Sequence, residues 1–518
     1  MDIAVFILSG LIFGGFLALN VRKSLHMFQL NSYKPATHAL WLRRNPHTLV
    51  PGLVLAVAAV IAGLLQNPLV GALLVAAVNS LGGLFVKPGK AKKPLVYTQR
   101  VWRMIGTMAL LTAVAVACAA VWNIWFWVMA VLGAVSPLLV LVANFLNKPV
   151  EKAINRWFVN DAKRILKSCP DLTVIGVTGS YGKTSVKFIL KTLLEAKYNV
   201  LATPESYNTP MGVVITIRNQ LRATHEVFVC EMGARHVGDI KEICDIVHPN
   251  HGIITSVGPQ HLETFFTLDN VKKTKFELAD ALPQDGTVFL NGEDENIASY
   301  RDHVKNRAVS YGLSQACDYY ATDISASSRG TTFTVHTPKG ERETLTAALI
   351  GRHNVINILG AVAICCELGI SLAALKPQVR RLESVPHRLQ LLPKGNGVTV
   401  IDDAYNANPA GTRAAIDALA LFDGFKVLVT PGMVELGDRQ AELNKAFGAY
   451  AAPVCDYVVL VGKKQTAPIY EGLLEAGYPR DRIYVADALG DAITRAYGVN
   501  AGGREKIILL ENDLPDNF

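Results

Sequence analysis

The chain has 518 residues, half of them hydrophobic, which allows several domains and does not by itself separate a soluble protein from a membrane protein. The distribution of charge is more informative, because residues 1–150 hold 12 Lys and Arg and a single acidic residue, Asp2, whereas the remainder holds 39 basic and 42 acidic residues. The net charge of +8 therefore comes from the first 150 residues, where basic residues lie between apolar runs. Because the excess of basic residues is confined to segments between apolar runs, the charge does not indicate a nucleic-acid partner. It is typical of a membrane protein.

Five apolar runs follow one another in the first 150 residues, at about 3–20, 48–66, 68–86, 104–121 and 123–146. Each is close to the ~20 residues that a helix needs to cross a bilayer. Basic residues gather after the first run and after the third, while the other two connections carry no charge. The positive-inside rule then places the N-terminus outside and everything after Lys148 in the cytoplasm.

We therefore expect residues 1–150 to form a transmembrane domain of about five helices in the bacterial inner membrane, in contact with lipid. The first run lacks the basic n-region of a cleaved signal peptide. Burial of these runs in a large soluble core is the alternative, and the alternation of charge argues against it. A hairpin of the second and third runs at Asn67-Pro68 would change the number of crossings. The eight cysteines form no C-x-x-C pair, which indicates thiols in a reducing compartment.

After residue 170 the sequence changes to short β-branched runs followed by Gly-rich turns and helix-like segments, which predicts a parallel sheet covered by helices. The first run, Leu172 to Val177, leads into the sequence TGSYGKTS and an amphipathic helix. Backbone N–H groups of such a loop, with the helix N-terminus, bind phosphate. The predicted nucleotide-binding residues are Gly179, Ser180, Gly182, Lys183, Thr184 and Ser185.

In this phosphate loop, Lys183 is expected to hold the β- and γ-phosphates and Thr184 a Mg²⁺ ion. The spacing departs from the usual G-x-x-x-x-G-K-S/T, because Val177 stands at the first glycine position. The alternative is an ordinary helix N-terminus. The order of strand, loop and helix favours the nucleotide site.

Two further strand ends supply candidate metal ligands. The second run, Glu226 to Cys230, leads to Glu231, and the third, Gly252 to Val257, is followed by His261. Carboxyl ends of parallel strands face the crevice where ligands bind, so Thr184, Glu231 and His261 are predicted to hold Mg²⁺. A hydrogen-bonded structural histidine is the alternative for His261.

Eight motifs in order, between about Thr173 and Ala488, resemble the Mur ligase family: TGSYGKTS, EMGARHVGDI, HLE, TKFE, LNGEDEN, GRHNVINILGA, PHR and VIDDAYNANP. The forms VIDDAYNANP and GMVELG look most like those of the member that adds D-Ala-D-Ala. The resemblance implies a P-loop, parallel-sheet central ATP-binding domain at 151–387 and a Rossmann-like C-terminal domain at 388–518.

The resemblance also implies roles for single residues. Lys275 matches a lysine that is carbamylated in several members; a plain surface lysine is the alternative. Asn291 matches a contact to adenine, Asn354 and Asn357 match asparagines near nucleotide and substrate, and Arg388 and Asp403 match residues that reach phosphates and ribose. Lys183, Lys275, His261 and Arg388 are the expected catalytic residues. The expected substrate-facing residues are Asn208, Thr209, Tyr405, Asn406 and Asn408.

The activity implied is ATP-dependent amide-bond formation through an acyl phosphate, with ATP and two Mg²⁺ ions as cofactors, on a peptidoglycan precursor and an amino acid or dipeptide. Two departures leave the substrates open. Apolar runs stand where the soluble members have the domain that binds the UDP part of the precursor, so we expect an acceptor that is lipid-linked or otherwise presented at the bilayer, with a nucleotide-linked precursor as the alternative. Glu511-Asn512-Asp513 stands where the family usually has a Lys-Gly-Ser-Arg-like turn. The alternatives are a poly-γ-glutamate synthase-like ligase and a nucleotide-binding membrane scaffold without catalysis.

Overall fold

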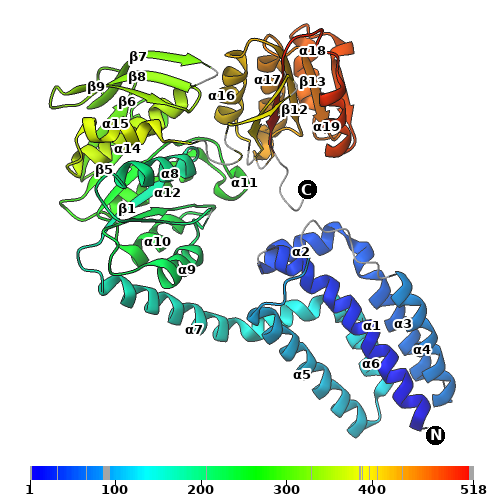
Figure 1. Ribbon diagram of the computed structural model, residues 1–518. Helices are drawn as coiled ribbons and strands as arrows, with labels where there is room; N and C mark the ends of the chain where they lie inside the picture. The colour runs from blue at the N-terminus through cyan, green and yellow to red at the C-terminus, as the bar shows by residue number, and fades with distance from the viewer. Residues whose placement is uncertain are drawn as a thin grey trace. The chain divides into compact units, whose positions relative to one another are not determined.

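The computed structural model describes residues 3–31, 33–65, 67–85, 94–205, 207–327, 330–383, 387, 389–395, 397–404, 407–434 and 436–512 (Figure 1). The chain divides into two compact units, one built on Met1–Trp157 and the other on Phe158–Leu514. The predicted domain boundary at 150 and 151 falls inside a single helix, α7 (Leu139–Lys167).

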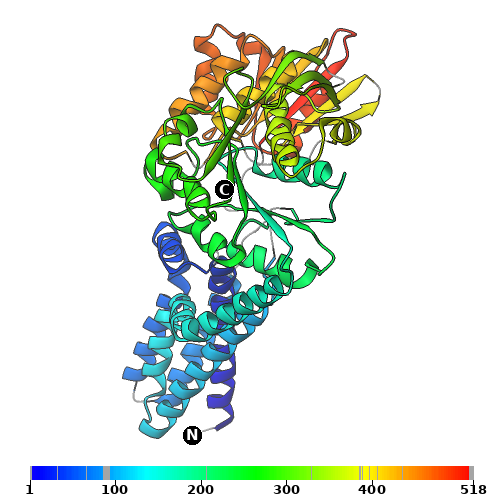
Figure 2. The same ribbon diagram turned by 90° about the vertical axis from the view of Figure 1, so that its left-hand side faces the viewer.

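The first unit is helical. Before α7 its helices are α1 (Ile3–Leu30), α2 (Pro35–Arg44), α3 (Val50–Leu64), α4 (Pro68–Phe85), α5 (Gln99–Trp122) and α6 (Trp125–Val135). Helix α3 packs against α4 and α6, and α4 also packs against α1 (Figure 2). Buried apolar side chains such as Phe28, Leu55 and Met104 form the core of this unit.

Two stretches among the described residues are long and apolar enough to cross a membrane, Gln99–Trp122 and Trp125–Lys167. The first contains the run predicted at 104–121, and the second contains all but the first two residues of the run predicted at 123–146. Val50–Leu64 and Pro68–Leu81 are apolar helices of shorter length. The five predicted crossings are therefore not confirmed, although every predicted run overlaps a helix of this unit.

A nine-stranded sheet forms the middle of the second unit, in the order β2-β3-β1-β4-β5-β6-β7-β8-β9. Neighbouring strands are parallel from β2 to β7, as predicted, but β8 and β9 continue the sheet antiparallel, which was not predicted. The strands are β1 (Thr173–Thr178), β2 (Val200–Ala202), β3 (Val227–Glu231), β4 (His251–Ile254), β5 (Thr287–Asn291), β6 (Arg307–Gly312), β7 (Tyr319–Ser327), β8 (Gly330–His336) and β9 (Arg342–Ala347).

Helices cover both faces of this sheet, so its parallel strands are buried on both sides. Apolar residues of α8 (Lys183–Leu194), α14 (Arg352–Glu367) and α15 (Leu372–Arg380) pack in one core. The other core contains residues of α7, α9 (Pro210–Gln220), α10 (Asp239–Val247) and α12 (Leu268–Asp280). The short helices α11 (Leu262–Phe265) and α13 (Glu295–Ala298) follow β4 and β5.

A second sheet follows, in the order β10-β11-β15-β12-β13-β14, and only β10 among these six strands runs antiparallel to its neighbour. Helices α16 (Pro409–Ala420), α17 (Gln440–Ala451) and α18 (Ala467–Glu475) contribute to one core, and α19 (Leu489–Gly498) to the other. This covered parallel sheet fits the predicted Rossmann-like domain. The strands are β10 (Gln390–Gly395), β11 (Val398–Asp403), β12 (Phe425–Thr430), β13 (Tyr457–Val461), β14 (Ile483–Ala486) and β15 (Lys506–Glu511).

Candidate nucleotide and metal site

The loop between β1 and α8 has a backbone that requires glycine at two positions. Gly179 has a φ of 154° and Gly182, which caps α8, has a φ of 79°. A Cβ atom on Gly179 would overlap the hydroxyl oxygen of Thr255, and one on Gly182 would lie 3.0 Å from Oδ1 of Asn357. The loop thus has the conformation expected for close approach of backbone to phosphate.

The segment after β4 holds this loop in place. The N–H of Ser180 donates to the carbonyl of Ser256 at 2.8 Å, and the N–H of Tyr181 donates to the Ser256 hydroxyl at 2.7 Å. The Tyr181 ring is partly buried, and the loss of solvent around its hydroxyl raises the pKa of that group. The predicted third strand was too long at its end, because β4 stops at Ile254 and the following residues turn to bond the loop.

Lys183 begins α8 with its ammonium at the loop. Its Nζ donates to the carbonyl oxygens of Gly179 at 2.6 Å and Ser180 at 3.1 Å. Asn357, on α14, lies beside Gly182, so this predicted nucleotide-binding residue does adjoin the loop. Ser185 follows on the first turn of α8.

The Glu231 carboxylate, at the end of β3, is the centre of a buried polar network. Its Oε1 accepts the Thr184 hydroxyl at 3.1 Å and the Nδ2 of Asn208 at 3.0 Å. Its Oε2 lies 3.0 Å from Nζ of Lys187, and the side chains of this ion pair are 1% and 0% exposed. The structure thus brings the predicted residues Thr184, Glu231 and Asn208 together and adds Lys187, which the sequence analysis missed.

Thr184 and Glu231 fit a Mg²⁺ ion. Neighbouring oxygens of an octahedral ion with bonds of 2.0–2.1 Å are about 2.9 Å apart, close to the 3.1 Å between the Thr184 hydroxyl and Oε1 of Glu231. Among the described residues, no group of three or more His, Cys, Asp and Glu side chains could hold a metal ion. A Mg²⁺ ion bound to a nucleotide takes most of its ligands from phosphate and water, so two protein oxygens suffice.

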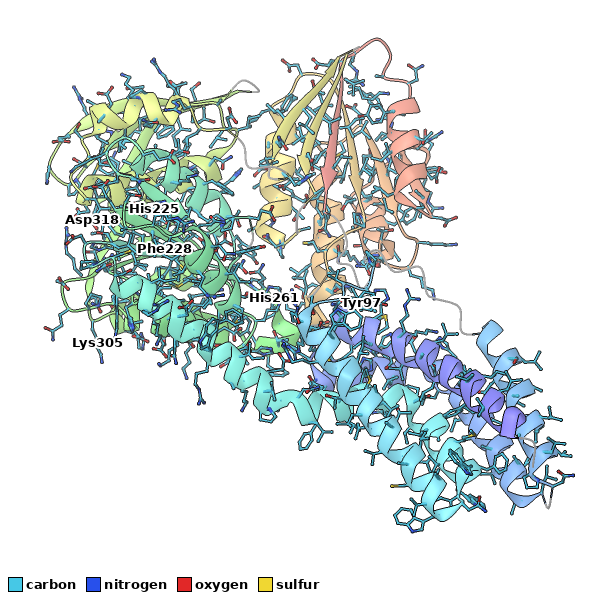
Figure 3. All side chains as sticks on the ribbon, turned by 60° about the horizontal axis from the view of Figure 1, so that its bottom comes forward. Tyr97, His225, Phe228, His261, Lys305 and Asp318 are labelled. Atoms are coloured by element: carbon cyan, nitrogen blue, oxygen red, sulfur yellow. The ribbon has the colours of Figure 1, made fainter. Side chains whose placement is uncertain are left out.

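Two further expected catalytic residues are His261, immediately before α11, and Lys275, on α12. His261 precedes α11 with a φ of 53° and is labelled in Figure 3. Lys275 is 2% exposed, which rules out a plain surface lysine. Burial, followed by the charge of Lys183, holds its pKa well below the ordinary value of 10.5. A buried amine that gives up its proton is a nucleophile able to react with carbon dioxide.

Asn291 and Asn354 bond the protein's own backbone. The Nδ2 of Asn291 donates to the carbonyl of Thr255 at 2.9 Å, and its Oδ1 accepts the N–H of Glu293 at 3.0 Å. The Nδ2 of Asn354 donates to the carbonyl of Ile350 at 2.8 Å. Asn291 therefore fixes the segment that packs on the phosphate loop.

Two of the expected substrate-facing residues cap helices. Thr209 precedes α9 and accepts the N–H of Gly212 at 3.3 Å, and Asn408 precedes α16 and accepts the N–H of Gly411 at 2.8 Å. A proline follows each, the common arrangement of cap and first helical residue. This pair of a cap residue and a following proline can be read from the sequence. The predicted residues Arg388, Tyr405 and Asn406 lie outside the described residues.

Side chains at the end of the second sheet hold neighbouring loops. Asp403 accepts the N–H of Leu389 at 3.1 Å. Asn512 accepts the N–H of Ala407 at 3.0 Å and donates to the carbonyl of Gly432 at 2.5 Å. The departure from the family turn thus has a structural role, since Asn512 joins the loops after β11 and β12.

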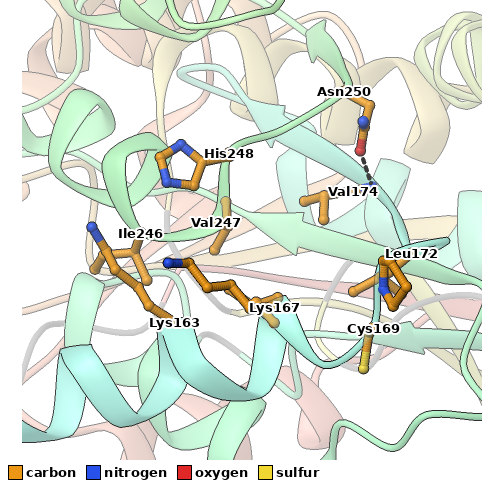
Figure 4. Close-up of a pocket in the computed structure, with 11 residues that line it drawn as sticks. Lys163, Lys167, Cys169, Leu172, Val174, Ile246, Val247, His248 and Asn250 are labelled. Carbon is orange, nitrogen blue, oxygen red and sulfur yellow. Dashed lines mark hydrogen bonds between the residues drawn. The ribbon is translucent and has the colours of Figure 1, made fainter.

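A pocket on the second unit lies away from the phosphate loop (Figure 4). Its lining includes Leu172, Val174 and Asn250, at the starts of β1 and β4, and the N–H of Val174 donates to the Asn250 side chain at 2.7 Å. Lys163, Lys167 and His248 also line it. Because strand starts and strand ends lie on opposite edges of a parallel sheet, this pocket is separate from the site around Glu231.

The buried parallel sheet, the glycine loop before α8 and the carboxylate on the next strand define a P-loop nucleotide-binding protein of the α/β class. Residues 177–365 match the Mur ligase middle domain, and residues 387–510 match the domain described as Mur ligase, glutamate ligase domain. The chain belongs to the Mur ligase family, as the sequence motifs predicted.

Relatives with the most similar sequences include two named UDP-N-acetylmuramoyl-tripeptide--D-alanyl-D-alanine ligase. The one from Escherichia coli is 34% identical over 57% of this chain and 65% of its own length. The one from Bacillus subtilis is 32% identical over 60% of this chain and 66% of its own length. The chain therefore spans slightly less than two thirds of each of these relatives.

The chain is also similar to solved structures of MurF. A crystal structure of MurF from Acinetobacter baumannii has a TM-score of 0.64 and 27% identity, covering 69% of this chain and 77% of that one. MurF ligase from Thermotoga maritima in complex with ADP has a TM-score of 0.61 and 26% identity, covering 69% and 80%.

Proposed function

We propose that the chain is an ATP-dependent, ADP-forming amide ligase that joins D-Ala-D-Ala, or a similar amine, to a peptidoglycan precursor. The observation that carries the proposal is the buried Glu231 carboxylate bonded to the Thr184 hydroxyl directly beside the glycine loop. The names of the relatives support the choice of substrates, and the complex of the Thermotoga maritima protein with ADP supports the choice of nucleotide.

The chemistry requires no nucleophilic side chain. An oxygen of the acceptor carboxylate attacks the γ-phosphorus of ATP, the bond to the bridging oxygen breaks, and ADP leaves, which gives an acyl phosphate. The amine then attacks the carbonyl carbon, loses a proton, and the C–O bond to phosphate breaks to form the amide. Lys183, whose Nζ lies at the loop carbonyls, would neutralise charge on the transferred phosphoryl group.

Mg²⁺, when bound, would neutralise charge on the β- and γ-phosphates. Thr184 and Glu231 would hold one ion, and His261 with a carbamylated Lys275 would hold a second. The buried position of Lys275 and its lowered pKa support carbamylation, which needs a neutral amine. Following the family, Asn291, Asn354, Asn357, Arg388 and Asp403 would complete the nucleotide and substrate contacts, with Asn208 beside the acceptor.

We further propose that the helical unit anchors the ligase in the bacterial inner membrane with its catalytic part in the cytoplasm. Large apolar side chains of α5 are exposed, including Leu110 at 65%, Val121 at 78% and Trp122 at 66%. In water such a surface would be unfavourable, whereas lipid would cover it. A membrane-bound enzyme could receive a lipid-linked acceptor as well as a nucleotide-linked one.

Mass spectrometry of reactions with the purified full-length chain, ATP, Mg²⁺ and D-Ala-D-Ala tests this function. Precursors linked to UDP and to lipid are offered separately. A product heavier by the added dipeptide in either reaction supports the ligase, and the better acceptor identifies the linkage. A product extended by glutamate would instead indicate a poly-γ-glutamate synthase-like enzyme, although the match at residues 387–510 favours the Mur ligase.

Lys183→Ala provides the matched control. Removing this ammonium is expected to lower ligation by roughly 10²-fold to 10³-fold, and to leave the melting temperature within a few degrees of wild type, because Lys183 is only partly buried. ATP hydrolysis that depends on an added amine separates a ligase from a scaffold, whereas binding of ATP without hydrolysis or ligation would favour the scaffold.

A further inference from the structure

Lys187 lies one turn beyond Thr184 on α8 and is completely buried. Its ammonium is 3.0 Å from Oε2 of Glu231, and it donates a hydrogen bond to the backbone carbonyl of Glu205. A buried ammonium is stable only with such partners. The contact with Glu205, whose φ is 39°, gives the ammonium a second partner besides Glu231.

The two oxygens of the Glu231 carboxylate therefore have different surroundings. Oε1 accepts the Thr184 hydroxyl and the Asn208 amide, whereas Oε2 faces the Lys187 ammonium. A cation shared with the Thr184 hydroxyl can reach Oε1. It cannot also take Oε2 without displacing the ammonium, because two cations would meet at one oxygen.

This division matters for the choice of metal. Mg²⁺ requires six ligands in near-ideal octahedral geometry, which suits one oxygen from a carboxylate, while Ca²⁺ takes six to eight and accepts both oxygens of one carboxylate. We propose that Lys187 holds Glu231 as a one-oxygen ligand and so makes the nucleotide site select Mg²⁺ over Ca²⁺. The proposal rests on the proposed function, since it assumes a metal–nucleotide complex at Thr184 and Glu231. Lys187 is then a positioning residue.

Calorimetry of ADP binding to the full-length chain in detergent, with Mg²⁺ or Ca²⁺ and without acceptor, measures this selectivity apart from turnover. In Lys187→Met, we expect the affinity for ADP with Mg²⁺ to fall about tenfold, and the affinity with Ca²⁺ to fall less or to rise. The ratio of the two affinities therefore moves toward Ca²⁺. An unchanged ratio in the folded variant would overturn the proposal.

Lys191→Met is the matched control. Lys191 lies one turn further along α8, with its side chain 42% exposed and 3.7 Å from Glu195. The same loss of charge at this exposed position is expected to leave the ratio of affinities unchanged. An equal shift in this variant would mean that any charge on α8 sets the ratio, which would also count against Lys187.

Circular dichroism melting shows whether each variant folds. Lys187→Gln is the milder variant, because its amide can still donate to Glu231 without a charge, and it should move the ratio in the same direction. Loss of the fold in both neutral variants would assign Lys187 to stability alone and overturn the proposal. If the wild-type chain binds no ADP with either metal, the proposed function itself fails.

Discussion

The two sheets of the second unit carry similar polar side chains at their strand ends but use them differently. Around Glu231 the partners are other side chains, from α8 and from the turn before α9. In the second sheet, Asp402, Asp403 and Asn512 accept backbone N–H groups of Ala404, Leu389 and Ala407. Side-chain partners can be exchanged for a ligand by a change of rotamer, whereas backbone partners hold a loop in one shape. The strand ends around Glu231 are therefore suited to binding a ligand, and those of the second sheet to holding loops.

Neutralising one carboxylate at the strand ends of each sheet is expected to give the largest difference in the free energy of unfolding. Glu231→Gln leaves Lys187 buried without an ion partner, so the free energy of unfolding should fall by ~3–5 kcal/mol. Asp402→Asn should cost ~1 kcal/mol or less, because the side chain of its hydrogen-bond partner His387 is 60% exposed. Urea unfolding of both variants measures this, and equal losses would remove the distinction.

Asn512→Ala tests the structural role of the second edge. It leaves the N–H of Ala407 and the carbonyl of Gly432 without this partner, at an expected cost of ~1–3 kcal/mol. Urea unfolding should show this loss, while calorimetry should show unchanged binding of ADP. Weaker ADP binding without a loss of stability would assign Asn512 to ligand contact instead.

Gly179→Ala tests whether the phosphate loop depends on its backbone conformation. The added Cβ would overlap Thr255 in a backbone region that favours glycine, so stability should fall by more than ~1 kcal/mol, and ADP binding should weaken. Gly490→Ala is the control, because nothing lies within 4 Å of its added Cβ. It should change stability by about 0.5 kcal/mol or less.

Lys275 is expected to make the stability of the protein depend on pH. Because its folded pKa is well below the ordinary 10.5, the unfolded chain binds a proton that the folded chain has released between these two values. The stability of the wild type relative to Lys275→Met should therefore rise with pH up to about 10.5, by at most ~1.4 kcal/mol per pH unit. Unfolding in buffer free of carbon dioxide measures it. A flat difference would mean that the amine keeps its proton when folded.

Local signals explain what the sequence predicted well. The glycine loop and the strand before it lie within a dozen residues of each other, so their pattern is complete in the sequence. Glu231 was identified from its place at a strand end, which depends only on the parallel sheet. The caps Thr209 and Asn408 also had a local signal, the proline that follows each, which the sequence analysis did not use, and their expected contact with substrate stays a prediction.

Partners distant in sequence explain what was missed. Lys187 looks like a polar position on an amphipathic helix, and its burial depends on Glu231, which is 44 residues further along the chain. The antiparallel strands β8 and β9 extend a sheet whose earlier strands gave a strong parallel pattern. The buried ion pair cannot be inferred from neighbouring residues alone, whereas the turn at Pro338 to Gly340 between β8 and β9 is a local hairpin signal that the sequence analysis did not use.

The hydrogen bonds from Lys183 to the carbonyls of Gly179 and Ser180 have a consequence for how ATP arrives. The lysine bonds the beginning of the loop, so internal hydrogen bonds hold the curvature of the loop. Binding then exchanges two internal bonds for contacts to the nucleotide and requires no folding of the segment. Association should consequently be accompanied by only a small change in heat capacity from this loop, unlike recognition by a segment that orders on contact.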